Sequence, residues 1–224
     1  MGAIARNIAN NITTSGVFTS SAITNSSVTG ITVLPGVGDD GITLISSQTA
    51  SSSASISFTS GLTSTYKAYK FVFVNCHPAT NGVDFEFNLS TDSGSNYNVT
   101  KTTTIFQAYH TEDGGASGLT YQGLDDLAQS TGYQTLTANG DGSGSMSNAD
   151  DSGVSGSLTI FNPASTTYVK HFISTTDNMV YTGGYMTASY VAGYANTTSA
   201  INAIQFRMSS GNIDDGKIYL YGIK

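Results

Sequence analysis

The sequence predicts an all-β protein, an antiparallel β-sandwich or jelly roll with an extended N-terminal arm. Ser and Thr supply 62 of the 224 residues and Gly another 25, whereas Lys and Arg together supply 8. This composition is typical of strands and turns rather than of helices. From residue 42 onward, short strand-like runs recur with Gly-rich turns between them and no helical crossovers. This arrangement argues against an α/β enzyme fold.

Residues 1–35 are predicted to form the arm. They are rich in Ser, Thr and Asn and carry one charge, Arg6, so they bury too little to fold alone and would gain order against another surface. We assign assembly or attachment to the isolated apolar residues Ile4, Ile8, Ile12, Val17, Phe18, Ile23 and Val28. A flexible linker is the alternative. The segment LPGVGDDG at 34–41 is rich in turn residues, which places the domain boundary there and leaves residues 36–224 as the sandwich.

Ten strand-like runs follow the boundary. In the run VDFEFNL, apolar residues that should face the core alternate with polar ones that should face water, Asp84, Glu86 and Asn88, and INAIQFRM at 201–208 repeats the pattern. YKAYKFVFVN at 66–75 is apolar on both faces after Lys70, which predicts a strand covered on each side, by the opposite sheet or by a neighbouring chain. The remaining runs lie at 42–47, 54–59, 98–109, 155–162, 167–175, 186–194 and 216–223. The one helix candidate is LDDLAQ at 124–129.

The sequence disfavours binding to nucleic acid, contact with a membrane and classical export. The eight Lys and Arg residues are scattered, so we expect no nucleic acid. The longest apolar run, FVFV, is far shorter than the roughly 20 residues of a membrane helix, so we expect no membrane contact. The first residues lack the apolar stretch of a signal peptide, so we expect no classical export.

The sequence also predicts no catalytic residue, no cofactor and no metal ion. His77, His110 and His171 lie far from one another in the sequence, without the spacing of a zinc site. Cys76 and His77 are adjacent, so in a strand their side chains point to opposite faces, which is poor geometry for a thiolate and its base.

Acidic residues occur in four neighbouring pairs. The pairs are Asp39–Asp40, Asp125–Asp126, Asp150–Asp151 and Asp214–Asp215. Neighbouring carboxylates in turns can hold calcium, but the loop NGDGSGSMSNADD fails the EF-hand pattern. None of the pairs lies in a sequence context typical of the acid and nucleophile of a glycosidase.

Tyrosines gather in the stretch YTGGYMTASYVAGY, which contains Tyr181, Tyr185, Tyr190 and Tyr194. Aromatic faces stack on sugars, so the cluster is a candidate glycan platform. Tyrosines of this kind also border cores or build subunit interfaces, and both interpretations stay open.

The chain from Leu44 to Lys224 resembles a family of virion structural proteins from tailed phages of aquatic bacteria. The resemblance is carried by several phrases, of which STTYVKHFIS and the closing SGNIDDGKIYLYGIK are the most specific, with YKAYKFVFVNCHPAT and FQAYHTEDG beside them. The arm resembles the N-terminal attachment segments of phage fibre and head-surface proteins. The resemblance implies a place on a virion and brings no catalytic motif.

These observations together predict a capsid decoration or cement protein on the virion exterior. Its arm and a homotrimeric sandwich would stabilise the shell of the major capsid protein, because symmetric association adds buried area to a chain without disulfides. The alternative is a tail or collar fibre adhesin, whose loops at 111–118, 139–152 and 181–184 would bind host-surface glycan. A third possibility, a free carbohydrate-active enzyme, is disfavoured because the sequence shows no catalytic residues of such an enzyme.

Overall fold

The computed structural model describes residues 41–138, 145–180 and 184–224, and Gly41–Lys224 form one compact unit. The predicted arm with its seven candidate residues lies outside the described residues, as do Asp39, Asp40 and Tyr181. Among the residues that the structure describes, none belongs to a helix of the length and apolarity needed to cross a membrane.

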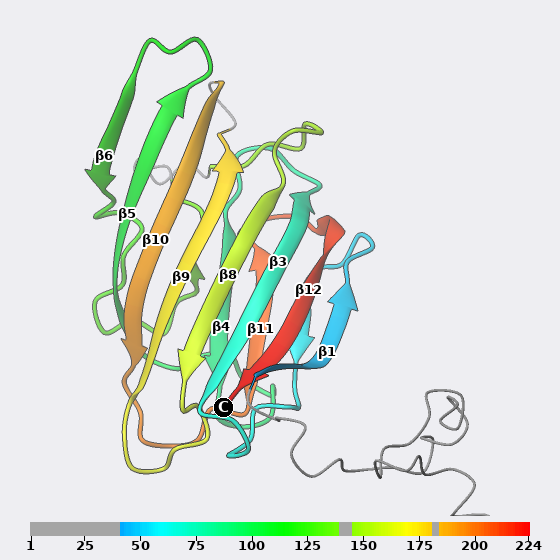
Figure 1. The fold of residues 1–224 in the computed structure, drawn as a ribbon, viewed down its shortest axis with the longest axis vertical. Helices are drawn as coiled ribbons and strands as arrows, with labels where there is room; N and C mark the ends of the chain where they lie inside the picture. The colour runs from blue at the N-terminus through cyan, green and yellow to red at the C-terminus, as the bar shows by residue number, and fades with distance from the viewer. Residues whose placement is uncertain (1–40, 139–144, 181–183) are drawn as a thin grey trace, which may run out of the picture. The chain divides into compact units, whose positions relative to one another are not determined.

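The predicted antiparallel sandwich is confirmed. Its larger sheet has eight strands, in the spatial order β1 (Ile42–Thr49), β12 (Ile213–Ile223), β3 (Ala68–Pro78), β8 (Val154–Phe161), β9 (Lys170–Met179), β10 (Tyr185–Ala195), β5 (Lys101–Thr111) and β6 (Ser117–Tyr121). Its smaller sheet has four, in the order β2 (Ile56–Phe58), β11 (Ala203–Met208), β4 (Phe85–Ser90) and β7 (Gln134–Thr135). All neighbouring strands pair antiparallel. The smaller sheet covers one face of the larger one (Figure 1).

The core lies between the two sheets and is dominated by phenylalanines. Phe206 of β11 is surrounded by the rings of Phe71 and Phe73 from β3, at centroid distances of 5.3 and 5.1 Å, and by Phe85 from β4 at 5.8 Å. The alternating runs place Phe85 and Phe206 on the inner face of the smaller sheet, as predicted, because successive side chains of a strand point to opposite faces. Ring pairs at these distances add to the stability that burial of their apolar area gives.

The expectation that the polar residues of β4 face water was wrong. Asn88 is fully buried, and its Nδ2 donates to the carbonyls of Tyr97 at 2.7 Å and Thr131 at 2.9 Å. Glu86 is 9% exposed and accepts a hydrogen bond from Arg207 Nε at 2.6 Å. Loop segments of the chain cover this face of β4, and the polar side chains satisfy the backbone groups that such loops bring with them.

The helix expected at 124–129 was also wrong. Residues 123–125 form a turn, closed by a hydrogen bond from the Asp125 amide to the Gln122 carbonyl at 3.1 Å. The three apolar residues Leu124, Leu127 and Ala128 are too few to stabilise a helix of one to two turns, and Leu124 is 72% exposed instead of packing. Two short strands, β6 and β7, were not predicted.

A glycine allows the close pairing of β8 and β9. Gly156 has a φ of 145°, and a Cβ there would lie 2.3 Å from the carbonyl oxygen of Thr175. A side chain at this position would push β8 and β9 apart, so only glycine fits.

Candidate interaction surface

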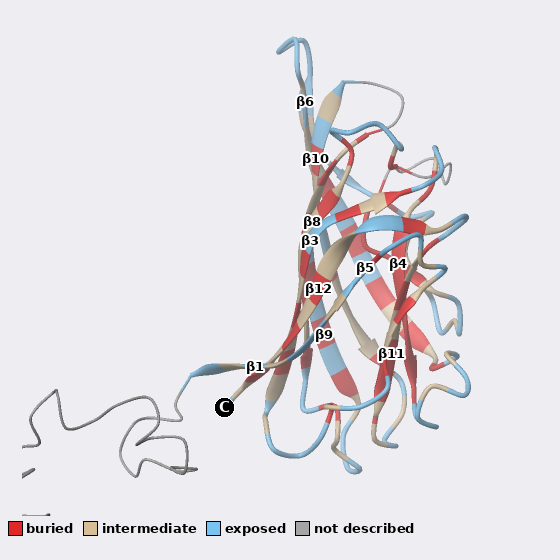
Figure 2. Cartoon of the chain, turned by 90° about the vertical axis from the view of Figure 1, so that its right-hand side faces the viewer, coloured by how far each residue is buried: buried red, intermediate tan, exposed pale blue. Residues whose placement is uncertain are grey.

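The outer face of the larger sheet, which points away from the smaller sheet, is covered by no described element (Figure 2). Within the described part of the chain, twelve large apolar side chains are exposed. Ten of them lie on this outer face: Ile42, Leu44, Val74, Phe106, Leu119, Tyr121, Phe161, Ile173, Met186 and Tyr190. The other two, Leu124 and Tyr168, lie in loops.

A row of aromatic side chains crosses three strands of this face. Tyr190 of β10 pairs with Phe106 of β5, and their rings stack with a centroid distance of 5.0 Å and an interplanar angle of 10°. Phe106 in turn pairs with Tyr121 of β6, which is 57% exposed. We call Phe106, Tyr121 and Tyr190 the aromatic ridge.

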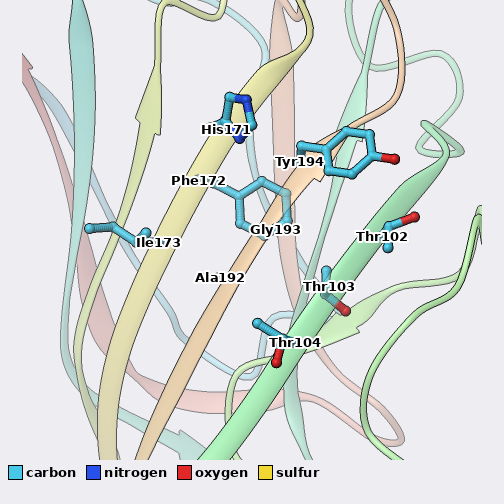
Figure 3. Close-up of a pocket in the computed structure, with 9 residues that line it drawn as sticks. All are labelled: Thr102, Thr103, Thr104, His171, Phe172, Ile173, Ala192, Gly193 and Tyr194. Atoms are coloured by element: carbon cyan, nitrogen blue, oxygen red, sulfur yellow. The ribbon is translucent and has the colours of Figure 1, made fainter.

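A hollow lies beside the aromatic ridge on the same face. One part of about 390 Å³ lies over Ala192 and Gly193 between His171, Ile173 and Tyr194 (Figure 3). A second part of about 230 Å³ extends toward Tyr190, and Ala192, Ile173 and Thr104 line both parts. The small residues of β10 make this depression, because their neighbours on β5 and β9 are longer. We call it the Ala192 hollow.

The polar groups at one end of the Ala192 hollow bond to one another. Gln129 Nε2 donates to the hydroxyl oxygens of Thr102 at 2.6 Å and Tyr194 at 3.1 Å, and Gln129 Oε1 accepts from Asn196 Nδ2 at 2.6 Å. A ligand rich in hydroxyls would have to compete with these contacts. The Ala192 hollow therefore suits an apolar side chain better than a sugar.

The candidate tyrosines do not form one cluster. Tyr190 and Tyr194 lie on the outer face, where Tyr194 lies beside His171 at a ring distance of 6.1 Å. Tyr185 lies on the other face of β10 and packs edge-on against Tyr109, with ring centroids 6.0 Å apart. Among the described tyrosines of the stretch, Tyr185 therefore lies on the opposite face of the sheet from Tyr190 and Tyr194.

Two of the predicted acidic pairs lie together. Asp150, Asp151, Asp214 and Asp215 line a hollow of about 500 Å³ with His77, whose Nε2 lies 2.7 Å from the carbonyl oxygen of Ala149. Among the described residues, no three His, Cys, Asp or Glu side chains lie close enough together to hold a metal ion. Asp126 instead accepts a hydrogen bond from the Tyr121 hydroxyl.

The surroundings of Cys76 and Asp113 are explained by the fold itself. Cys76 is buried, and burial raises the pKa of its thiol to about 12, which disfavours a thiolate. Asp113, in the loop after His110, accepts a hydrogen bond from the Gly115 amide at 2.8 Å, and this contact is the main cause that lowers the pKa of its carboxyl.

Two lysines are fully buried, which the sequence analysis did not foresee. Lys101 and Lys170 flank Ala195 on the inner face of the larger sheet. Lys101 Nζ donates to Asn88 Oδ1 at 2.5 Å and to the Val99 carbonyl at 2.8 Å, and burial lowers its pKa to about 7. Lys170 Nζ donates to the carbonyls of Thr197 and Ser199, and burial lowers its pKa as well. Both amines hold loops that close one end of the sandwich.

Comparisons with known protein families, with curated proteins and with solved structures found no match for this chain.

Proposed function

We propose that this chain is a structural protein of a phage virion, a capsid decoration or cement protein on the particle exterior. The observation that carries the proposal is the outer face of the larger sheet, which exposes ten large apolar side chains. Exposed apolar side chains that gather on one face of a protein are typical of contacts with other proteins. The resemblance of residues 44–224 to virion structural proteins supports the virion as the place of these contacts.

The proposed mechanism is mechanical. The sandwich associates as a homotrimer, and residues 1–35 attach it to the major capsid protein, so that each copy adds buried area across a junction of the shell. Such contacts stabilise the shell by mass action, since they exist only in the assembled state. The protein assembles in the host cytoplasm and requires neither cofactor nor nucleic acid.

A tail or collar fibre adhesin is the second candidate, and the aromatic ridge is the observation that favours it. Exposed aromatic rings are the groups that a sugar ring stacks on. The internal bonds of Thr102 and Tyr194 with Gln129 argue against it, because they occupy hydroxyls that would otherwise orient a glycan.

The experiment is a binding assay with particles that lack this protein. Full-length protein should bind them and raise the temperature at which they release DNA, whereas protein without residues 1–35 should melt as a folded sandwich and fail to bind. Normal binding by the shortened protein would refute attachment through the arm. Loss of host-cell adsorption on Tyr190→Ala, with shell stability unchanged, would favour the adhesin.

A further inference from the structure

The outer face carries exposed apolar side chains along strands that have no described cover. β3 shows this most directly, since Tyr69, Phe71 and Phe73 pack inward, whereas Val74 on the opposite face is 44% exposed. The sequence of β3 predicts a strand that is covered on both sides. The smaller sheet supplies one cover, and the other has to come from outside the described fold.

Charge limits what the cover can be. The chain has a net charge of -7, so two copies repel each other wherever their carboxylates meet. Along β5, β9 and β10, the outer face carries one carboxylate, Asp177, among fifteen outward positions. Few carboxylates would therefore meet if two copies approached through this part of the surface.

Shape also favours a second copy. The aromatic ridge lies next to the Ala192 hollow, so one face carries both a row of exposed rings and a depression. A contact between identical chains requires both complements on the same chain. The four adjacent strands β9, β10, β5 and β6, about 4.8 Å apart and up to about 30 Å long, present on the order of 600 Å², which approaches the roughly 800 Å² per partner of a standard interface.

We propose that the outer face around Ala192 is the contact surface between copies of this chain, with the aromatic ridge of one copy in the Ala192 hollow of the next. This inference deepens the proposed function, because it assigns a surface to the oligomer of which the virion protein is built. In a trimer, the three larger sheets would face the common axis.

The test is sedimentation velocity of the full-length protein, whose single-chain mass is 23.2 kDa. The wild type should sediment at a multiple of that mass. Ile173→Asp, which places a charge in the Ala192 hollow at a residue that is 52% exposed, should sediment as a single chain and associate at least 100-fold more weakly. Ala192→Leu, which fills the hollow without adding charge, should also weaken association. Leu124→Asp, at an exposed loop residue, is the matched control and should leave the mass unchanged.

Circular dichroism and thermal melting of each variant show that the sandwich stays folded, which is expected because both substituted positions lie on the outer face. A single-chain wild type, or an oligomer that Ile173→Asp leaves intact, would overturn the contact surface. A dimer that Ile173→Asp separates would support the surface and refute the trimer of the proposed function. Association in solution together with failure to bind particles would refute the virion role alone.

Discussion

Lys101 should make the stability of this protein depend on pH in the alkaline range. Its amine is fully buried without a carboxylate partner, and burial lowers its pKa to about 7 in the folded chain from the ordinary lysine value of 10.5. Between these two values the unfolded chain holds a proton that the folded chain has lost, so the free energy of unfolding rises with pH. The slope is about 1.4 kcal/mol per pH unit, or about 2 kcal/mol from pH 7.5 to pH 9.

The substitution Lys101→Met isolates this effect, because Met has a similar length and no charge. Urea unfolding of wild type and variant at pH 7.5, 8.25 and 9.0, at one protein concentration, gives the difference in unfolding free energy. This difference should shift by about 2 kcal/mol in favour of the wild type across the range, since the other titrating groups are common to both proteins.

Lys67→Met, at an exposed lysine in the loop before β3, is the control and should keep the slope of the wild type. Parallel stability curves for the wild type and Lys101→Met would refute the reasoning. They would mean that the Lys101 amine keeps its proton in the folded state.

Two further predictions concern Asp84 and Gly156. Burial raises the pKa of Asp84 to about 6 from 3.8, so the folded chain binds the extra proton between these values and stability falls as pH rises through them. Asp84→Asn should therefore stabilise the protein by up to about 3 kcal/mol at pH 7 and much less at pH 4 by urea unfolding; an equal effect at both pH values would contradict this. Gly156→Ala should cost more than about 2 kcal/mol and lower the melting temperature, because its Cβ would meet the Thr175 carbonyl at 2.3 Å; an unchanged melting temperature would show that the two strands separate freely.

Most of the fold was predictable because alternation in a strand reports burial directly. The runs that became β4 and β11 place Phe85, Phe87 and Phe206 in the core as expected. β6 was missed since its five residues have little apolar pattern and bury almost nothing, and β7 since it has two residues. The burial of Asn88 was not predictable from its own strand, because loops from distant parts of the sequence cover it.

The interaction surface was predictable only in part. The tyrosine stretch drew attention to β10, and Tyr190 does lie on the outer face, but sequence proximity does not place Tyr185 on the same face. A better signal was present in neighbouring apolar pairs within strands: Ile105–Phe106, Ile160–Phe161, Phe172–Ile173 and Tyr190–Val191. Such a pair places one apolar side chain on each face, so four strands with such pairs indicate a sheet with two apolar faces. Which strands adjoin, and hence where the Ala192 hollow lies, requires the pairing itself.

The number of copies per virion, counted by quantitative mass spectrometry against the major capsid protein, tests the central claim most directly. A decoration protein of the shell should be present in hundreds of copies, because the icosahedral lattice offers that many equivalent sites. A few copies to a few dozen would contradict the shell assignment and indicate a tail or collar fibre. Absence from purified particles would refute the virion role altogether.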